Sequence, residues 1–284
     1  MKVDTAAIVS HLKQHRYPYI IGAVILAFNL SVLRDLIADW IRDDNYSHGF
    51  FIIPISIFLF WRRRNELTFP AKPSGWGLTL FIAGCVGLLF GIAASEYFTT
   101  RLGLVMIVTG VALNHLGTAN FRVVWFSFFF LLFMIPIPAI IYYSATLPMQ
   151  LFASGITENF LSLLGVQSYR LGNIIHLPDY ALEVTEACSG LRSLMTLMAL
   201  GALYGYMFLP GKVVPTLLFV ATVPIAVATN MFRLIFTALA AYAISPKIAE
   251  DFLHELSGLM VFVIALTLMV ITGAILTWAR KRLS

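Results

Sequence analysis

Long apolar runs are the feature that most constrains how this chain can fold. A helix needs about 20 mostly apolar residues to cross the ~30 Å hydrocarbon core of a bilayer. Residues 75–94, 121–141, 188–209 and 254–278 approach or exceed that length. Charged residues make up only 12% of the 284 residues, roughly half the share found in soluble domains. Because a backbone in lipid must satisfy its hydrogen bonds internally, the sequence predicts an all-α polytopic membrane protein.

The order of the apolar runs and of the charges predicts about eight transmembrane helices. With the N-terminus placed inside, the inner segments carry 12 of the 19 Lys and Arg residues, as the positive-inside rule expects. Both termini are then cytoplasmic, and the net charge of +5 reflects topology and not a nucleic-acid partner. Residues 34–47 are expected to form an outer loop. The predicted spans cover 17–33, 46–61, 75–94, 100–116, 121–141, 188–209, a run that begins near 213, and 254–278.

The longest stretch outside the predicted spans covers residues 142–187. Its first part, 142–164, is expected to be a helix that lies in or re-enters the outer interface and ends at Gly165. Two short strands are expected around Pro178-Asp179, so that a β-hairpin leads into the sixth span. We therefore predict a single integral-membrane domain, 1–284. It would consist of helices one to five (1–141), the extracytoplasmic segment (142–187) and helices six to eight (188–284).

A cysteine stands where this polar segment meets the sixth span. Cys188 is one of two cysteines, and it would lie in the first turn of a membrane helix, where unpaired N–H groups and the helix dipole favour the thiolate. Glu186 and Arg192 would share that turn. The other cysteine, Cys85, lies inside an apolar run and is expected to be a small packing residue.

The seventh span contains a second unusual feature, because Asn230 and Arg233 are three residues apart and share one helix face. An intramembrane arginine is costly and normally faces a partner or a wet cavity. Cys188 precedes Gly211, in the predicted inner turn, by 23 residues, and Arg233 follows it by 22. In helices these counts correspond to about 33–35 Å. Both side chains should therefore lie at the outer membrane boundary.

His254 precedes Trp278, at the inner end of the last span, by 24 residues and so reaches the same level. The three residue types suit acyl transfer. A thiolate is a nucleophile, a histidine exchanges protons near neutral pH, and an arginine stabilises an oxyanion. Taken singly, each residue also fits a structural role as filler, snorkelling cation or cap. Equal depth does not by itself bring the three groups into contact.

Four blocks of the sequence resemble those of the exosortase/archaeosortase family. They are residues 186–193 (Glu-Ala-Cys-Ser-Gly-Leu-Arg-Ser), 230–234 (Asn-Met-Phe-Arg-Leu), 254–258 (His-Glu-Leu-Ser-Gly), and the second span with its Tyr46-Ser47-His48 start. Members of that family are integral-membrane cysteine transpeptidases or proteases. The resemblance implies that Cys188, Arg233 and His254 are catalytic. The residues expected to support them or to bind substrate are Glu186, Ser189, Gly190, Arg192, Asn230 and His48.

The same resemblance implies the substrates and the location. The expected substrates are membrane-anchored proteins with a C-terminal sorting signal, which consists of a short motif (Pro-Glu-Pro in the PEP-CTERM class), a membrane helix and a basic tail. Cleavage through a thioester would take place at the extracytoplasmic face of a prokaryotic inner membrane. The lipid bilayer is an implied partner, and polysaccharide-export machinery is a further candidate. No cofactor is expected, and the six histidines lack a metal-ligand spacing.

Two other classes of function stay open at this point. A permease or flippase could line a path with Asn114, His115, Asn230 and Arg233, but it predicts polar residues at several depths, whereas here they gather mainly at one face. A scaffold for a secretion or polysaccharide-export complex would not need the cysteine. For Glu186, helix capping is the plainer alternative to a role in catalysis, and for His48 it is a structural hydrogen bond.

Overall fold

The computed structural model describes residues 20, 24, 27, 29–178, 180–185, 190–243 and 252–283, and leaves the side chains of 252–257 and 283 undescribed. The chain divides into two compact units, Met1–Pro138 and Ala139–Ser284. Most of the predicted first span lies outside the described residues. The described part of the first unit consists of α3 (Leu30–Arg42), η1 (Asp44–Tyr46), α4 (Gly49–Arg63), η2 (Arg64–Glu66), α5 (Gly75–Ala93), α6 (Tyr97–Phe130) and η3 (Leu131–Met134).

The loop predicted for residues 34–47 is wrong, because most of it belongs to the amphipathic helix α3. Leu36 and Trp40 are four residues apart and therefore share a face, and both are buried. The Trp40 indole Nε1 donates a hydrogen bond of 3.0 Å to the Met134 carbonyl. The charges of this segment suggested a loop, but charges can lie on the outer face of a helix whose apolar stripe is buried.

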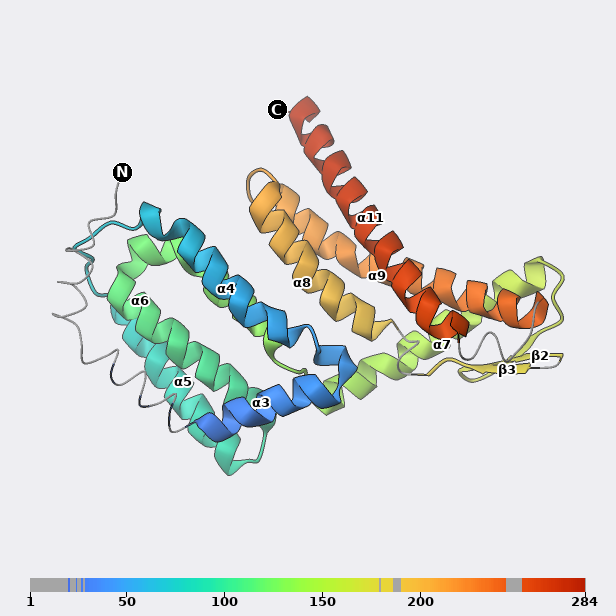
Figure 1. Cartoon of the computed structure of the whole chain (residues 1–284), viewed down its shortest axis with the longest axis horizontal. Coiled ribbons are helices and arrows are strands. Elements are labelled where there is room, and N and C mark those ends of the chain that lie inside the picture. Colours follow the sequence, from blue (N-terminus) through green and yellow to red (C-terminus); the bar gives the residue numbers. More distant parts are fainter. Residues whose placement is uncertain are drawn as a thin grey trace. The chain divides into compact units, whose positions relative to one another are not determined.

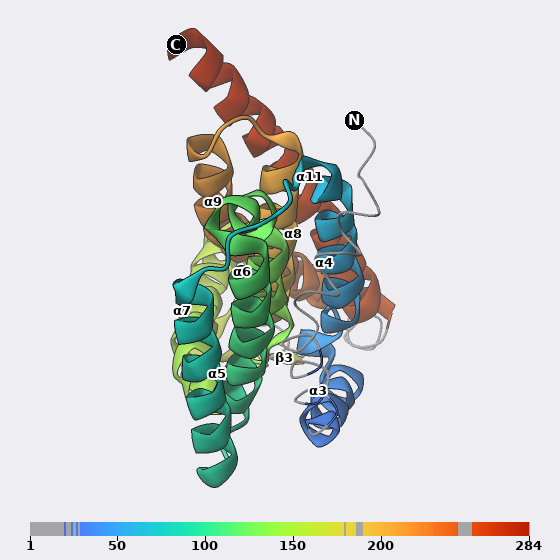
Figure 2. The same cartoon turned by 90° about the vertical axis from the view of Figure 1, so that its left-hand side faces the viewer.

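Helices α5 and α6 lie side by side in two views of the first unit (Figures 1 and 2). Glycines at seven-residue intervals bring the two backbones together. A Cβ atom added to Gly84 would lie 2.8 Å from the Ile107 backbone nitrogen, and one added to Gly103 would lie 2.6 Å from that of Leu88. Small residues commonly allow this close approach between membrane helices.

Helix α6 is interrupted at Gly117, which has φ 69° and ψ 166°. This position lies in the gap between the predicted fourth and fifth spans. A side chain is excluded there twice over, because the positive φ favours glycine and the carbonyl oxygen of Lys72 occupies the place of a Cβ atom. After the interruption α6 continues to Phe130 and η3 to Met134, so the fifth helical segment ends before the predicted residue 141.

The second unit begins with α7 (Ala139–Leu163), which ends as predicted at Gly165 with φ 77°. Three strands follow, β1 (Tyr169–Leu171), β2 (Ile174–Leu177) and β3 (Tyr180–Glu183), as one antiparallel sheet in the order β1-β2-β3. The predicted hairpin is β2–β3, whereas β1 was not predicted. A Gly172-Asn173 pair between β1 and β2 is a hairpin signal that could have revealed β1.

One face of this sheet packs against α7 and the C-terminal part of α9 (Val213–Ala243). The sheet is held to α7 at its β1–β2 turn, where Ser154 Oγ donates to the Gly172 carbonyl at 3.2 Å. The core between these elements therefore joins segments that are far apart in the sequence. Its buried residues are Ala153, Leu161, Val166, Ile175, Leu177, Leu182, Val184, Leu234, Ala238 and Ala241.

Helices α8 (Leu191–Phe208), α9 and α11 (Phe252–Leu283) pack together in the second unit (Figure 1). Their shared core contains Leu197, Leu218, Ala226, Ala265 and Met269. At the α8–α9 turn the Arg280 guanidinium donates to the Pro210 carbonyl, which ties the end of α11 to this turn.

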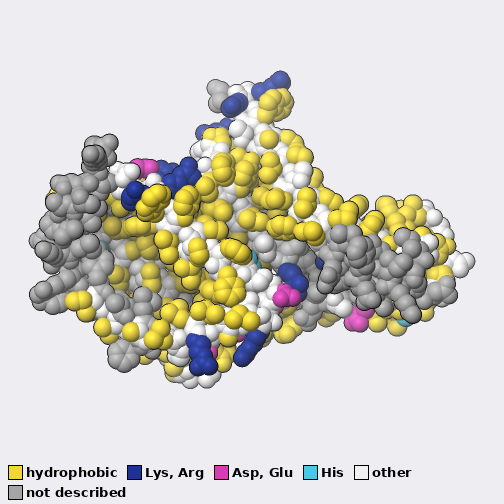
Figure 3. Space-filling model, in the orientation of Figure 1, with side chains coloured by type: hydrophobic (Ala, Val, Ile, Leu, Met, Phe, Trp, Pro, Cys, Tyr) yellow, Lys and Arg dark blue, Asp and Glu magenta, His cyan; other side chains and the backbone are white. Residues whose placement is uncertain are grey.

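Among the described residues, five helices are long and apolar enough to cross a membrane: Gly75–Ala93, Tyr97–Met134, Leu191–Phe208, Val213–Ala243 and Gly258–Arg282. The predicted count of eight is not confirmed. Hydrophobic side chains cover most of the described surface on the face in Figure 3, whereas Lys and Arg side chains mark the C-terminal end of α11. Such a surface suits contact with lipid and not with water.

Candidate functional site

Close approaches between described residues of α8 and α9 fix the register of this helix pair. Near the turn, a Cβ atom added to Gly205 would lie 3.1 Å from the Pro215 Cβ. Farther from the turn Gly201 faces Thr222, and at the start of α8 Gly190 faces Asn230. The partners in each pair lie at nearly equal numbers of residues from the turn, so the two helices run antiparallel without a large stagger.

Among the described residues, the predicted site residues Gly190 and Asn230 lie in direct contact. Gly190 caps α8 in the left-handed conformation with φ 86°, and a Cβ atom on it would lie 3.0 Å from both Cβ and Cγ of Asn230. The Asn230 side chain is buried. Ser193, which sequence reasoning did not single out, closes the first turn through a 2.9 Å hydrogen bond from its Oγ to the Gly190 carbonyl.

Arg233 lies on α9 between two differently packed regions. One turn before it, Asn230 contacts the start of α8. The next residue, Leu234, is buried in the core that α9 shares with α7 and the sheet. Arg233 itself is half-buried. The α9 backbone at Arg233 therefore lies about one helical turn beyond the level of Gly190 at the start of α8.

The remaining predicted residues of this region divide into described and undescribed ones. Arg192 is half-buried in the first turn of α8. Glu186, Cys188 and Ser189 lie outside the described residues. His254 belongs to the first turn of α11, but its side chain is not described. The prediction that the thiol, the guanidinium and the imidazole meet therefore stays a prediction.

The packing of α11 gives its register with respect to α8. A Cβ atom added to Gly273 would lie 2.8 Å from Tyr204 Cε1, and one added to Gly201 would lie 3.6 Å from the Met269 sulfur. The two helices thus run in the same direction along their packed parts, and the N-terminal ends of both lie away from the α8–α9 turn.

His48 belongs to the first unit and precedes α4. Its Nε2 donates a hydrogen bond of 3.2 Å to the carbonyl of Phe133 in η3. Tyr46, two residues earlier, accepts a 3.3 Å bond on its hydroxyl from the Ile137 N–H. These contacts tie the start of α4 to the end of the α6–η3 segment, which is the structural role considered for His48.

The apolar helices define the class of this molecule, a polytopic helical membrane protein. The family model described as transmembrane exosortase (Exosortase_EpsH) matches residues 40–271. Because the match extends over most of the sequence, the chain belongs to the transmembrane exosortase family. No curated protein and no solved structure gives a significant match.

Proposed function

We propose that this protein is a membrane-embedded cysteine transpeptidase or protease that cleaves a C-terminal sorting signal from exported proteins. The contact between Gly190 and Asn230 is the observation that supports this proposal most directly. It joins two of the sequence blocks that characterise the resemblance. Cys188 is two residues from one partner of this contact, and Arg233 is one helical turn from the other.

The proposed reaction is acyl transfer in two steps. The Cys188 thiolate attacks a substrate peptide carbonyl, and Arg233 together with N–H groups at the start of α8 stabilises the oxyanion. The C–N bond then breaks, a thioester forms, and the leaving amine takes a proton from the His254 imidazolium. In the second step water or an amine attacks the thioester, loses its proton to His254 and releases the thiolate. Hydrolysis and transpeptidation differ only in this second nucleophile.

The direction of the charges supports an extracytoplasmic site, which we place in the inner membrane of a prokaryote. Arg280, Lys281 and Arg282 end α11 near the α8–α9 turn, to which Arg280 is hydrogen-bonded. Basic residues favour the cytoplasmic side, so the opposite ends of α8, α9 and α11 would face outward. A substrate with a basic C-terminal tail would follow the same rule, and its cleavage motif would emerge on that outer side.

The decisive experiment is a search for the thioester. Purified full-length protein is incubated with a peptide that carries a Pro-Glu-Pro motif and part of the following helix, and Cys188 is examined by mass spectrometry. We expect an adduct whose mass equals the N-terminal peptide fragment and which hydroxylamine removes. Cys188→Ala should lack the adduct and the cleavage, while Cys85→Ala should retain both. Normal processing of a host substrate by Cys188→Ala would refute the proposal.

A further inference from the structure

The three-stranded sheet has an outward face that the core does not use. Its inward face contributes Ile175, Leu177, Leu182 and Val184 to the core of the second unit. A cavity of about 740 Å³ opens along the other face and extends to the β2–β3 turn, where the core residue Leu177 and Tyr180, which packs against the core, also line it. Its size lies within the range of ligand sites in proteins, about 300–1,000 Å³. Packing against the core explains the apolar residues of the inward face, but it does not explain the cavity.

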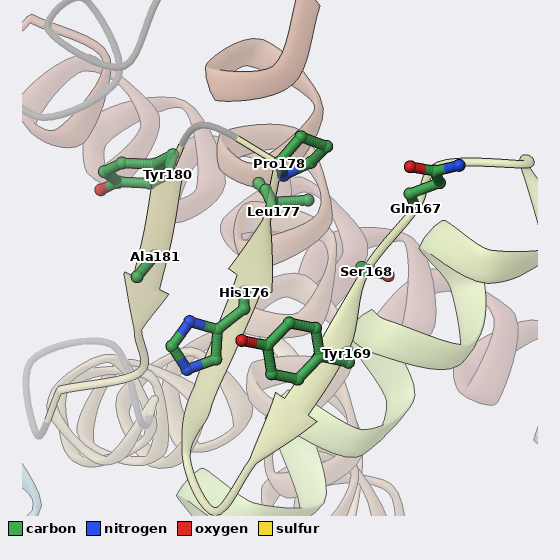
Figure 4. A pocket seen from close by; sticks show the side chains of 8 residues that line it. All are labelled: Gln167, Ser168, Tyr169, His176, Leu177, Pro178, Tyr180 and Ala181. Atoms are coloured by element: carbon green, nitrogen blue, oxygen red, sulfur yellow. The ribbon is translucent and has the colours of Figure 1, made fainter.

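Two flat side chains form the wall of this cavity (Figure 4). Tyr169 of β1 and His176 of β2 are paired in the antiparallel register, and their rings stack with centroids 4.6 Å apart and planes inclined by 10°. Although stacked, Tyr169 stays 64% exposed. An exposed pair of stacked rings offers apolar faces and polar edges to a ligand, the combination common in binding sites.

Polar groups stand beside this ring pair. Ser168 lies just before Tyr169 and lines the cavity, but its Oγ is buried, so a ligand in the cavity does not reach it. Gln167, also at this border, is exposed. Pro178 and Tyr180 line the cavity at the β2–β3 turn. The cavity therefore combines a ring platform with the polar side chain of Gln167 and the rings of Pro178 and Tyr180 at its borders.

The shape of the sheet favours an extended peptide over a compact ligand. β1 is an edge strand, and its three residues are all exposed. Among the residues that the structure describes, no further strand pairs with its outer edge. An open edge can pair with the backbone of an incoming strand, and alternate side chains of that strand then enter the neighbouring pocket. A saccharide would use the rings but not the edge.

The sheet is also connected directly to the Cys188 motif. The end of β3 is fixed in place, because Asn173 accepts a 3.0 Å bond on its carbonyl from the Val184 N–H and donates through Nδ2 to the Val184 carbonyl at 3.2 Å. Ala181, in the cavity wall, precedes Cys188 by seven residues. An extended chain of seven residues spans at most about 25 Å. A peptide bound on the sheet thus needs no more than about eight extended residues to reach the thiol.

We propose that the outward face of the β1–β3 sheet binds the extended segment of the substrate next to its scissile bond, with an apolar ring or aliphatic side chain of that segment resting on the Tyr169–His176 pair. This inference rests on the proposed function, because it names the substrate-recognition surface of the same site. Tyr169 and His176 are then specificity residues. They take no part in the chemistry at Cys188.

Kinetics can test the proposal with a matched pair of variants. Tyr169→Ala removes the exposed ring, and Leu171→Ala removes an apolar side chain that is 69% exposed on the same strand but does not line the cavity. We expect Tyr169→Ala to raise KM for the Pro-Glu-Pro peptide about tenfold, as the loss of one aromatic anchor typically does, with kcat unchanged. Leu171→Ala should behave like the wild type. An unchanged KM in Tyr169→Ala, or an equal rise in both variants, would overturn the proposal.

Photo-crosslinking in cells identifies the occupant independently of any chosen peptide. A benzoylphenylalanine replaces Tyr169 in the full chain with Cys188→Ala, which should retain bound substrate. The control carries the same group at Leu163, which is 84% exposed on α7 and does not line the cavity. We expect an adduct at position 169 only, mapped within about ten residues of the hydrophobic C-terminal helix of an exported protein. An adduct with glycan or lipid, or no adduct specific to position 169, would refute the proposal.

The two proposals fail in different ways. Processing that survives Cys188→Ala refutes the cysteine mechanism. If Cys188→Ala abolishes processing but Tyr169→Ala leaves KM unchanged, only the assignment of the sheet is refuted.

Discussion

The α5–α6 hairpin of the first unit and the α8–α9 hairpin of the second unit differ in where their helices come closest. In α5–α6, glycines bring the backbones together along the whole length, from Gly77 against Asn114 to Gly91 against Thr100. In α8–α9, Gly205 meets the backbone and ring of Pro215 near the turn, whereas Gly201 and, at the far end, Gly190 meet the side chains of Thr222 and Asn230. The first arrangement is uniform, whereas the second ends in the residues of the family blocks.

The amide side chains of the two units also differ in what they contact. Asn114 donates through Nδ2 to the Ser74 carbonyl at 3.0 Å, and Asn120 binds the backbone of Thr68 on both sides of its amide. These amides hold the segment before α5 against α6. A transport path would need such residues to face a solute, so the engagement of Asn114 weakens the permease alternative. In the second unit, Asn230 instead lies at the end of a hairpin beside the Cys188 motif.

The largest expected effect concerns Arg233 of the second unit. Arg233→Ala should lower kcat for the sorting-signal peptide by about 10²–10³, as the loss of an oxyanion-stabilising group does. Arg233→Lys should restore part of the rate, because it keeps the charge but loses the planar fork. The measurement is the cleavage rate per folded protein. A wild-type rate in Arg233→Ala would contradict the functional contrast between the two hairpins.

Arg101 of the first unit provides the control. Arg101 is buried and its Nη2 donates to Asp39 at 2.7 Å. Arg101→Ala should reduce the free energy of unfolding by about 1–3 kcal/mol, less than for a fully buried pair, since the partner carboxylate can return to water. Its cleavage rate per folded protein should stay at the wild-type value. A rate loss equal to that of Arg233→Ala would remove the distinction.

The close packing of α5 and α6 can be tested by adding a single methyl group. Gly84→Ala would place a Cβ atom 2.8 Å from the Ile107 nitrogen and 2.9 Å from the Gly103 oxygen, so the helices must separate. We expect a loss of about 1–3 kcal/mol of unfolding free energy, the usual cost of overpacking. Gly75→Ala, on the same helix with open space around it, should cost nothing. Thermal unfolding in detergent compares the two variants.

The contact between Gly190 and Asn230 predicts coupling between two substitutions. Gly190→Ala should cost about 1–2 kcal/mol because its φ is positive, in addition to crowding Asn230. Asn230→Ala removes two of the three crowding atoms. The loss of unfolding free energy in the double variant should therefore be smaller than the sum of the two single losses by at least ~0.5 kcal/mol. Gly258→Ala, which has open space around it, is the control. Strict additivity would show that the contact is absent in the membrane.

The smallest expected effect is a pH dependence in the first unit. The pKa of Glu96 is held below its ordinary value of 4.5, chiefly by the Thr99 hydroxyl, with the Thr99 and Phe98 N–H groups adding to the effect. A carboxylate with a lowered pKa contributes stability above its unfolded pKa and loses it as the pH falls through the folded value. Unfolding temperatures should therefore decline below about pH 4.5 in the wild type and decline less in Glu96→Gln. Glu96 is the N-cap of α6, and identical pH profiles would exclude its carboxylate as the cause.

Local sequence signals predicted those elements whose ends are set by neighbouring residues. The beginning of α5, the beginning of α9 and the end of α7 at Gly165 all follow from apolar runs bounded by Gly or Pro. The break at Gly117 lies where the sequence placed a boundary between spans. Such features depend on hydration and local backbone preference, which are encoded within a few residues.

Sequence by itself thus determined that the chain is a helical membrane protein and which of its blocks resemble those of the transmembrane exosortase family. Only the tertiary structure decided that residues 30–42 form a helix, because the burial of Leu36 and Trp40 depends on distant partners such as Met134. It also decided that Gly190 meets Asn230 and that Tyr169 stacks on His176. Counting residues along helices gives depth but not rotation or lateral position, and those depend on how side chains of separate segments pack.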